Sequence, residues 1–297
     1  MYWNSLNDHL KAAYGMKVYK LSLSSGCSCP NRDGTVGERG CIFCDGAGAF
    51  AESGDIAKQL EGAKGRVAAK IKGEGKYIAY FQSFTNTYGD PARLEGMFRA
   101  AMAPKDIVAL SIATRPDCLG EDIMAVLRRL NEVKPVWVEL GLQTIHSQTA
   151  AYIRRGYDLS VFDEAVRKLR DAGITAVVHQ ILGLPGETAD MMAETAHYIG
   201  QSGAHGIKFH LLHVLQGTDL AEDYRAGMFD VMTLEQYIAA LERCVRCIPR
   251  GMVIHRLTGD GAKKDLLAPL WSGDKKRVLN AIHAAFLRDD VEQGSAL

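Results

Sequence analysis

Residues 26–44 read GCSCPNRDGTVGERGCIFC and carry four of the seven cysteines of this 297-residue chain. Cys41 and Cys44 form a CxxC pair, and two thiolates at this spacing can bind one metal centre. Eleven residues separate Cys29 from Cys41, and the glycines among them leave the segment flexible enough to fold back and supply a third thiolate. Because the segment directly follows a short apolar run at 18–23, it predicts a metal site at the end of a first strand.

Two kinds of metal site fit these cysteines. Three thiolates on a four-iron cluster leave one iron open, which suits a cluster that activates a substrate, whereas electron-carrying clusters usually have four cysteines. If Cys27 also ligates, the four thiolates form a structural zinc site, although a CxC pair this far before a CxxC pair is an uncommon zinc motif. The cysteine spacing leaves both alternatives open.

The cysteine number and the first residues indicate a reducing compartment. Seven cysteines, four of them clustered, do not fit a disulfide framework. Residues 1–10 lack the basic and apolar regions of a secretory signal. We therefore expect a cytoplasmic protein.

The composition is that of an ordinary globular domain, with 47% hydrophobic and 24% charged residues. The 35 basic and 35 acidic residues cancel, so nucleic-acid binding would need a local basic patch. No run of 18 apolar residues occurs, so we expect no membrane partner.

Apolar runs and helical patterns alternate along the chain. This alternation predicts βα units around a parallel sheet, and it does not separate a barrel from an open doubly wound sheet. The predicted strands are 18–23, 77–81, 107–113, 136–142, 176–182, 207–212 and 252–257, and the predicted helices are 56–73, 91–102, 120–132, 159–172, 188–202 and 234–247.

Polar residues recur where the predicted strands end. Because the carboxyl ends of parallel strands meet at one edge, we expect these residues to lie together and to carry the function. They are 82–87, 114–117, 143–144, 183–187, His213 and 256–260.

Several separated stretches resemble the YhcC/YtqA family of radical S-adenosylmethionine (SAM) proteins, relatives of the radical SAM domain in the elongator catalytic subunit. The resemblance implies an α/β fold, a partial (β/α)6 TIM-like barrel. It also implies a single radical SAM domain over 1–297, with a core at about 17–260 and a C-terminal helical extension at about 261–297. The stretches are 29–34, 40–44, 80–82, 85–88, 113–118, 139–144, 181–188, 206–208, 210–213 and 254–261.

The resemblance implies a [4Fe-4S] cluster on Cys29, Cys41 and Cys44, with Cys27 as a departure from the usual family pattern. It implies that SAM chelates the open iron and is cleaved by one electron to a 5′-deoxyadenosyl radical, which abstracts hydrogen from the substrate. A reductant such as flavodoxin or ferredoxin is then an expected partner.

The same resemblance places the residues that would contact SAM and substrate. Glu139 would bind the ribose hydroxyls or the amino group, and a pairing of Glu139 with Arg115 is the structural alternative. The loop after the second strand would bind the SAM amino group, and the Gly-Leu-Pro-Gly turn would contact adenine. The expected SAM-binding residues are Gln82, Ser83, Thr85, Asn86, Glu139, Gln143, Gly183 and Pro185, and the expected catalytic residues are His210, His213 and Arg256.

For the substrate, the resemblance suggests the wobble uridine of tRNA, with a carboxymethylaminomethyl group converted to an aminomethyl group. Two basic groups offer phosphate contacts, or are merely solvated faces. The alternatives are a radical SAM enzyme acting on a small metabolite or a protein side chain, and a non-catalytic zinc-binding protein. The basic groups are Lys64, Arg66, Lys70, Lys72 and Lys76, and Lys263, Lys264, Lys275, Lys276 and Arg277.

Overall fold

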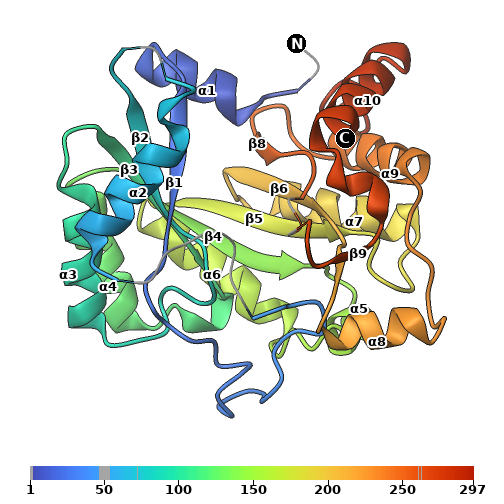
Figure 1. Ribbon diagram of the computed structural model, residues 1–297, viewed down its shortest axis with the longest axis horizontal. Helices are drawn as coiled ribbons and strands as arrows, with labels where there is room; N and C mark the ends of the chain where they lie inside the picture. The colour runs from blue at the N-terminus through green and yellow to red at the C-terminus, as the bar shows by residue number, and fades with distance from the viewer. Residues whose placement is uncertain (1–2, 47–53, 72, 260, 262) are drawn as a thin grey trace.

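Seven parallel strands form one curled sheet in the computed structural model (Figure 1), which describes residues 3–46, 54–71, 73–259, 261 and 263–297. Each strand pairs with the next in chain order, so the sheet has no reversal of the kind that defines a doubly wound fold. The strands are β1 (Val18–Leu23), β2 (Lys76–Phe81), β3 (Ile107–Thr114), β4 (Val136–Gln143), β5 (Thr175–Leu182), β6 (Gly206–Leu211) and β8 (Val253–Arg256).

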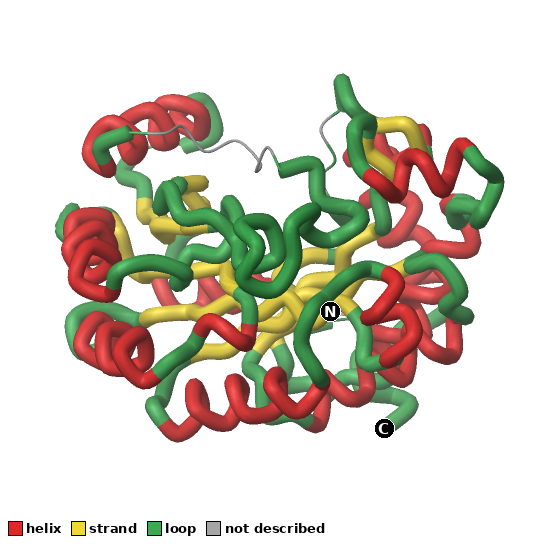
Figure 2. The backbone as a smooth tube through the Cα atoms, turned by 90° about the horizontal axis from the view of Figure 1, so that it is seen from below, coloured by secondary structure: helices red, strands yellow, loops and turns green. Residues whose placement is uncertain are grey.

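Helices follow the strands and cover the outer face of the sheet (Figure 2). Six strand-helix units and a seventh strand make an open half-barrel, which confirms the predicted α/β partial barrel. The covering helices are α2 (Ile56–Ala68), α3 (Pro91–Met102), α4 (Glu121–Asn131), α6 (Leu159–Asp171), α7 (Ala189–Gln201) and α9 (Leu234–Arg246).

The strands are apolar because both of their faces are covered. In β3, seven of the eight residues are buried, which is typical of parallel strands between helices and a filled interior. Phe81 of β2 packs edge-on against Phe98 of α3, with ring centroids 4.9 Å apart. Three of the covering helices begin at side-chain caps, such as Asp90 before α3 and Thr233 before α9, whereas α2, α4 and α6 have none.

Several elements were not predicted from the sequence. Helix α1 (Leu6–Tyr14) packs Leu10 against β1 and β2, and Ser5 forms a parallel bridge with Ile254 of β8. Helices α5 (Ser147–Tyr152) and α8 (Asp219–Arg225) are short, as are η1 (Pro116–Cys118) and η2 (Leu270–Gly273). Strands β7 (Val214–Leu215) and β9 (Leu266–Ala268) form a separate antiparallel pair.

Helix α10 (Lys275–Arg288) lies in the segment expected to be a helical extension, and it packs against α9. The division of the chain into a core and this extension stays a prediction. Among the described residues, no helix has the length and apolar character needed to cross a membrane.

Candidate active site

A cavity of about 280 Å³ lies at the carboxyl ends of the strands and gathers the predicted ligands. Cys29, Cys41 and Cys44 all line it, although they come from the long loop after β1. The side chains that close the other walls come from the ends of β2, β3, β4 and β5 and from the loop after α5. From the predicted SAM-binding set, the cavity is lined by Gln82, Thr85, Glu139 and Gln143.

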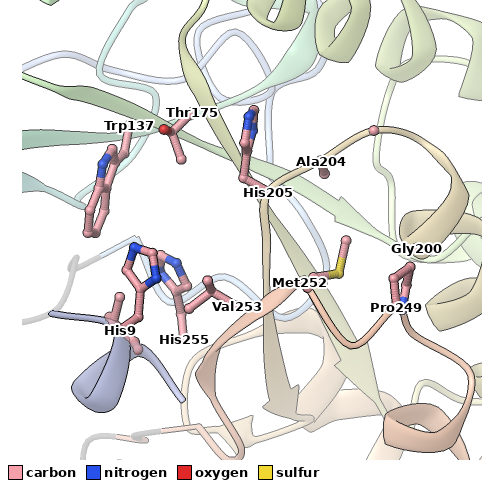
Figure 3. A pocket seen from close by; sticks show the side chains of 13 residues that line it. His9, Trp137, Thr175, Gly200, Ala204, His205, Pro249, Met252, Val253 and His255 are labelled. Atoms are coloured by element: carbon pink, nitrogen blue, oxygen red, sulfur yellow. The ribbon is translucent and has the colours of Figure 1, made fainter. Parts of the chain in front are cut away.

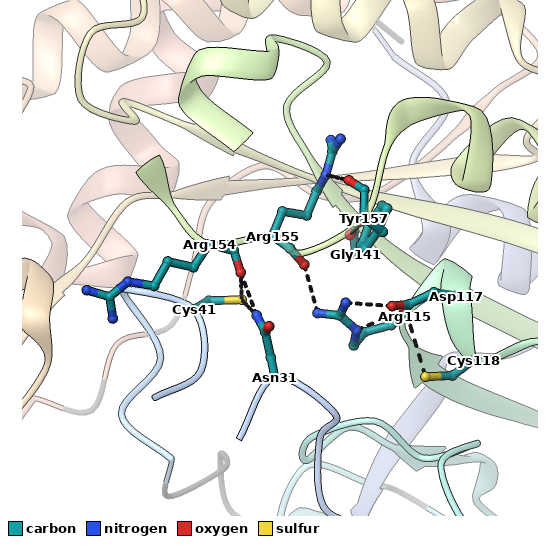
Figure 4. Close-up of polar contacts among 9 residues, drawn as sticks. All are labelled: Asn31, Cys41, Arg115, Asp117, Cys118, Gly141, Arg154, Arg155 and Tyr157. Carbon is teal, nitrogen blue, oxygen red and sulfur yellow. Dashed lines mark hydrogen bonds and ion pairs between the residues drawn. The ribbon is translucent and has the colours of Figure 1, made fainter. Parts of the chain in front are cut away.

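The cysteine loop is held by its own polar residues. Asn31 donates from Nδ2 to the Arg154 carbonyl and lies 3.5 Å from the Cys41 sulfur (Figure 4). Arg32 donates to the Cys44 carbonyl at 2.6 Å, and its guanidinium lies across Gly40. Gly40 has a φ of 77°, and a Cβ there would meet Arg32 Nε at 2.8 Å, so the loop requires glycine at this position.

Two arginines from other segments complete this wall. Arg115 makes a double ion pair with Asp117 and donates to the Arg155 carbonyl at 2.9 Å. Arg155 donates to the Thr144 carbonyl at 2.6 Å and to the Tyr157 carbonyl at 3.1 Å, the second of which is drawn in Figure 4. The guanidiniums of Arg115 and Arg155 both lie over the Tyr157 ring. The alternative that Arg115 pairs with Glu139 is therefore wrong, because Asp117, two residues away, occupies the guanidinium.

The charge environment suits an iron-sulfur cluster. Burial, and next the neighbouring Cys44, raise the pKa of Cys41 to about 11, so this thiol is protonated when it has no ligand. Arg32 and Arg115 interact electrostatically with Cys29 and Cys41 and would stabilise their thiolates once a metal displaces the protons. Three thiols facing one cavity beside two guanidiniums fit an anionic cluster with an open iron.

Cys27 does not share this arrangement. Its side chain is buried in the core, its sulfur accepts a hydrogen bond from Arg93 Nη2 at 3.2 Å, and it does not line the cavity. The position of Cys27 argues against the four-cysteine zinc alternative.

Glu139 lies at the floor of the cavity, fully buried inside the barrel. Lys20 and Ser111 each contact its Oε1 at 2.6 Å, while His179 contacts its Oε2 at 2.8 Å and Lys208 contacts the same oxygen. Burial opposes ionisation, but Lys20 and Lys208 outweigh it and hold the pKa of Glu139 well below its usual range.

A second cavity, of about 240 Å³, adjoins the first and shares Phe43, Gln143 and His179 with it. The expected catalytic residues His210 and His213 line this second cavity. Burial, and next His179 and Arg256, hold the pKa of His210 well below its usual range. Because Arg256 acts electrostatically on His210, it lies near the second cavity, but it lines neither cavity.

Four of the expected SAM-binding residues lie outside the lining of both cavities. Asn86 is fully buried and donates to the Ala113 carbonyl, so its amide braces the loop after β2. A Cβ at Gly183 would meet the Met232 sulfur at 3.1 Å, which indicates tight packing around this turn. The four residues are Ser83, Asn86, Gly183 and Pro185.

Sequence reasoning left several residues of the site unassigned. Arg155 and Tyr157 come from the loop between α5 and α6, where periodicity carries no signal. Lys20 and Lys208 could have been found from the sequence, because each is a charged residue inside a mostly apolar strand.

Comparison with known proteins assigns this fold and site to a class. A model of the radical SAM superfamily matches residues 32–199, and a model of the radical SAM C-terminal domain matches 204–288. The chain therefore belongs to the radical SAM superfamily and is a radical SAM enzyme, a class that uses a [4Fe-4S] cluster and SAM. The superfamily match begins after Cys29, so the assignment of that ligand depends on its position in the cavity.

Within the superfamily, the chain is similar to two bacterial proteins along nearly its whole length. It is 44% identical to protein YtqA of Bacillus subtilis, over 95% of this chain and 88% of YtqA. It is 35% identical to protein YhcC of Escherichia coli, over 99% of this chain and 95% of YhcC. The resemblance inferred from the sequence is thereby confirmed.

More distant relatives match in part. The tRNA uridine(34) acetyltransferase of Methanocaldococcus jannaschii is 27% identical, over 55% of this chain and 32% of its own length. The structure of Elp3 from Methanocaldococcus infernus superimposes with a TM-score of 0.72 at 16% identity, covering 93% of this chain and 64% of that chain. At this identity the superposition shows a shared fold.

Proposed function

We propose that this enzyme holds its cluster on Cys29, Cys41 and Cys44, binds SAM in the adjoining cavity, and acts on the wobble uridine of tRNA. The observation that carries the proposal is that the three thiols face one cavity at the carboxyl ends of the strands. When bound, the cluster supplies the electron that cleaves SAM to a 5′-deoxyadenosyl radical for hydrogen abstraction. A non-catalytic zinc-binding protein does not fit the family or the position of Cys27.

The residues of the first cavity would bind and orient SAM. Gln82, Thr85 and Gln143 present polar atoms to it, and Arg155 offers a cation to a carboxylate. Ser83 and Asn86 would support the loop after β2, while Gly183 and Pro185 remain the proposed adenine contacts. On the substrate side, His210, His213 and Arg256 are the proposed catalytic residues.

Two observations support tRNA as the substrate. A partial relative is named as a tRNA uridine(34) acetyltransferase. The two basic groups lie at opposite edges of the sheet, one on and after α2 and at the start of β2, next to β1, and one in the loop after β8 and at the start of α10 (Figure 1). The second group follows the carboxyl end of β8 and would contact phosphates near the cavity. The first group lies toward the amino ends of β1 and β2, where Lys76 begins β2 and Lys64 pairs with Asp106 just before β3, and would contact phosphates farther from the cavity. Lys72 of the first group lies outside the described residues.

The proposed reaction converts a carboxymethylaminomethyl group on this uridine to an aminomethyl group by breaking the bond between the amine nitrogen and the carboxymethyl carbon. SAM would serve as the two-electron oxidant of that carbon, which would leave, with the addition of water, as glyoxylate. The enzyme would take its electrons from a flavodoxin or ferredoxin and work in the cytoplasm, where its cysteines stay reduced. A radical SAM enzyme acting on a small metabolite or a protein side chain is the alternative.

A direct test uses tRNA from cells that lack the enzyme. The reconstituted enzyme is incubated anaerobically with SAM, a reductant and this tRNA, and nucleosides are quantified by mass spectrometry. We expect loss of the carboxymethylaminomethyl nucleoside and gain of the aminomethyl nucleoside. If SAM is cleaved while every tRNA nucleoside is unchanged, the tRNA proposal fails and small molecules become the substrates to test.

A further inference from the structure

His179 stands at the junction of the two cavities and lines both of them. Its side chain is 16% exposed, and it projects from β5 between the cysteine wall and the wall formed by His210 and His213. A substrate that extends from the second cavity into the first would lie against this imidazole. His179 is therefore placed to contact substrate directly.

Glu139 fixes the orientation of this ring. His179 Nε2 lies 2.8 Å from Glu139 Oε2, and an ionised carboxylate can only accept hydrogen bonds. Nε2 therefore carries the proton, and Nδ1 carries a lone pair. Among the described residues, Nδ1 has no hydrogen-bond partner.

Glu139 has no capacity left for another ligand. Lys20 and Ser111 occupy Oε1, while His179 and Lys208 occupy Oε2. The carboxylate is completely buried under these four partners. Its contacts suit a positioning residue for His179 better than a ligand for SAM hydroxyls.

The surroundings of His179 favour a neutral ring. Burial, and next the cation Lys208, lower the pKa of His179 to about 4, although Glu139 opposes this. Arg256 on β8 adds to the lowering, and the ring of His210 on β6 lies 4.9 Å away between centroids. Tyr80 on β2 and Lys20 on β1 reach the same Glu139 and Lys208 network.

We propose that His179, held in one tautomer by Glu139, is the specificity-determining residue that accepts a hydrogen bond at Nδ1 from an N–H group of the substrate. Because the ring is neutral and Nδ1 lacks a proton, it selects donors and disfavours groups that can only accept. The identity of the donor rests on the proposed function: we assign it to the amine of the carboxymethylaminomethyl group. The contact would hold the carbon beside this nitrogen near the cluster cavity.

Two substitutions at His179 test the roles of the two ring nitrogens one at a time. In His179→Gln the amide occupies the place of Nε2, so it can still donate to Glu139 but offers nothing at Nδ1. In His179→Asn the amide occupies the place of Nδ1 and can restore the acceptor. His197→Gln, at an exposed position on the outer helix α7, is the matched control.

The experiment measures three quantities for each variant: iron content, 5′-deoxyadenosine formed without RNA, and aminomethyl-uridine formed in tRNA. We expect His179→Gln to keep the first two within twofold of wild type. Its kcat/KM for tRNA should fall by about 100-fold, since a buried hydrogen bond to substrate is lost. His179→Asn should recover part of this loss, and His197→Gln should match wild type.

Each other outcome is decisive. If His179→Gln modifies tRNA as fast as wild type, the hydrogen bond does not exist and the inference is overturned. If it loses iron or forms no 5′-deoxyadenosine without RNA, His179 serves the cofactor site, and the inference also fails. If the wild type cleaves SAM but leaves the uridine unchanged, the proposed function fails, and the donor assigned to His179 falls with it.

Discussion

Both ends of the half-barrel contain cavities, one at the amino ends of the strands and two adjoining ones at the carboxyl ends. At the amino ends of the strands, a cavity of about 450 Å³ is lined mainly by apolar and aromatic side chains, with His9, His205 and His255 (Figure 3). The two adjoining cavities at the carboxyl ends measure about 280 Å³ and about 240 Å³. Volume alone therefore does not identify the end that holds the site.

Charge distinguishes the two ends. None of the described side chains around the amino-end cavity is Asp, Glu, Lys or Arg. The carboxyl-end cavity brings Arg32, Arg115, Arg155 and Glu139 together with three cysteines. Charged groups are costly to bury, so their concentration at one end marks the place where they are used.

The histidines of the amino end serve packing. His255 stacks edge-on against Trp137 at 5.4 Å between ring centroids, and a Cβ at Gly206 would meet its Nε2 at 2.8 Å. His205 accepts a hydrogen bond at Nδ1 from the Ala176 amide. These contacts fix the bottom of the barrel, so substitutions there should change stability without changing chemistry.

The largest effect is expected from Glu139→Leu at the carboxyl end. This change leaves Lys20 and Lys208 buried without their counter-ion, so the free energy of unfolding should fall by about 3–5 kcal/mol. Chemical denaturation measures this loss. Adding Lys208→Met should restore part of the stability, because it removes one of the uncompensated charges. An unchanged stability in Glu139→Leu would show that the buried network is not formed as described.

At the amino end, Met252→Ala should weaken the packing of the core and leave the chemistry unchanged. Met252 is 4% exposed, and truncation of a buried methionine costs about 2–3 kcal/mol. The rate of 5′-deoxyadenosine formation per folded, iron-loaded molecule should stay within twofold of wild type. A tenfold lower rate in this variant would contradict the division between a chemical end and a packing end.

The low pKa of His179 should make the free energy of unfolding depend on pH. Its folded pKa of about 4 lies below the value of about 6.5 in an unfolded chain. The unfolded state therefore takes up the proton first as the pH falls. The resulting loss of stability is absent above pH 6.5 and grows below it, reaching about 2 kcal/mol at pH 5.

Urea denaturation of wild type and His179→Gln between pH 5 and 8 measures this effect. The variant lacks the titrating ring, so its stability should fall less steeply below pH 6.5. Parallel curves for the two proteins would mean that the ring is accessible and titrates normally in the folded state.

Most of the fold could be predicted from the sequence because parallel strands buried on both faces are apolar along their length. The first predicted strand and the predicted helix at 91–102 match β1 and α3 in their bounds. Helix α1 and the β7–β9 pair were missed, since their positions depend on contacts with distant segments. The contacts of Glu139 were missed for the same reason, because its partners come from β1, β3, β5 and β6 and meet only when the sheet curls.

The most direct test of the account is to compare the cysteines one by one. The wild type and the variants Cys29→Ala, Cys41→Ala, Cys44→Ala and Cys27→Ala are reconstituted anaerobically with iron and sulfide and given dithionite and SAM. We predict that the first three variants lose 5′-deoxyadenosine formation at least about 100-fold, while Cys27→Ala keeps its iron and its activity. Activity in Cys29→Ala together with loss in Cys27→Ala would contradict the ligand set on which the account depends.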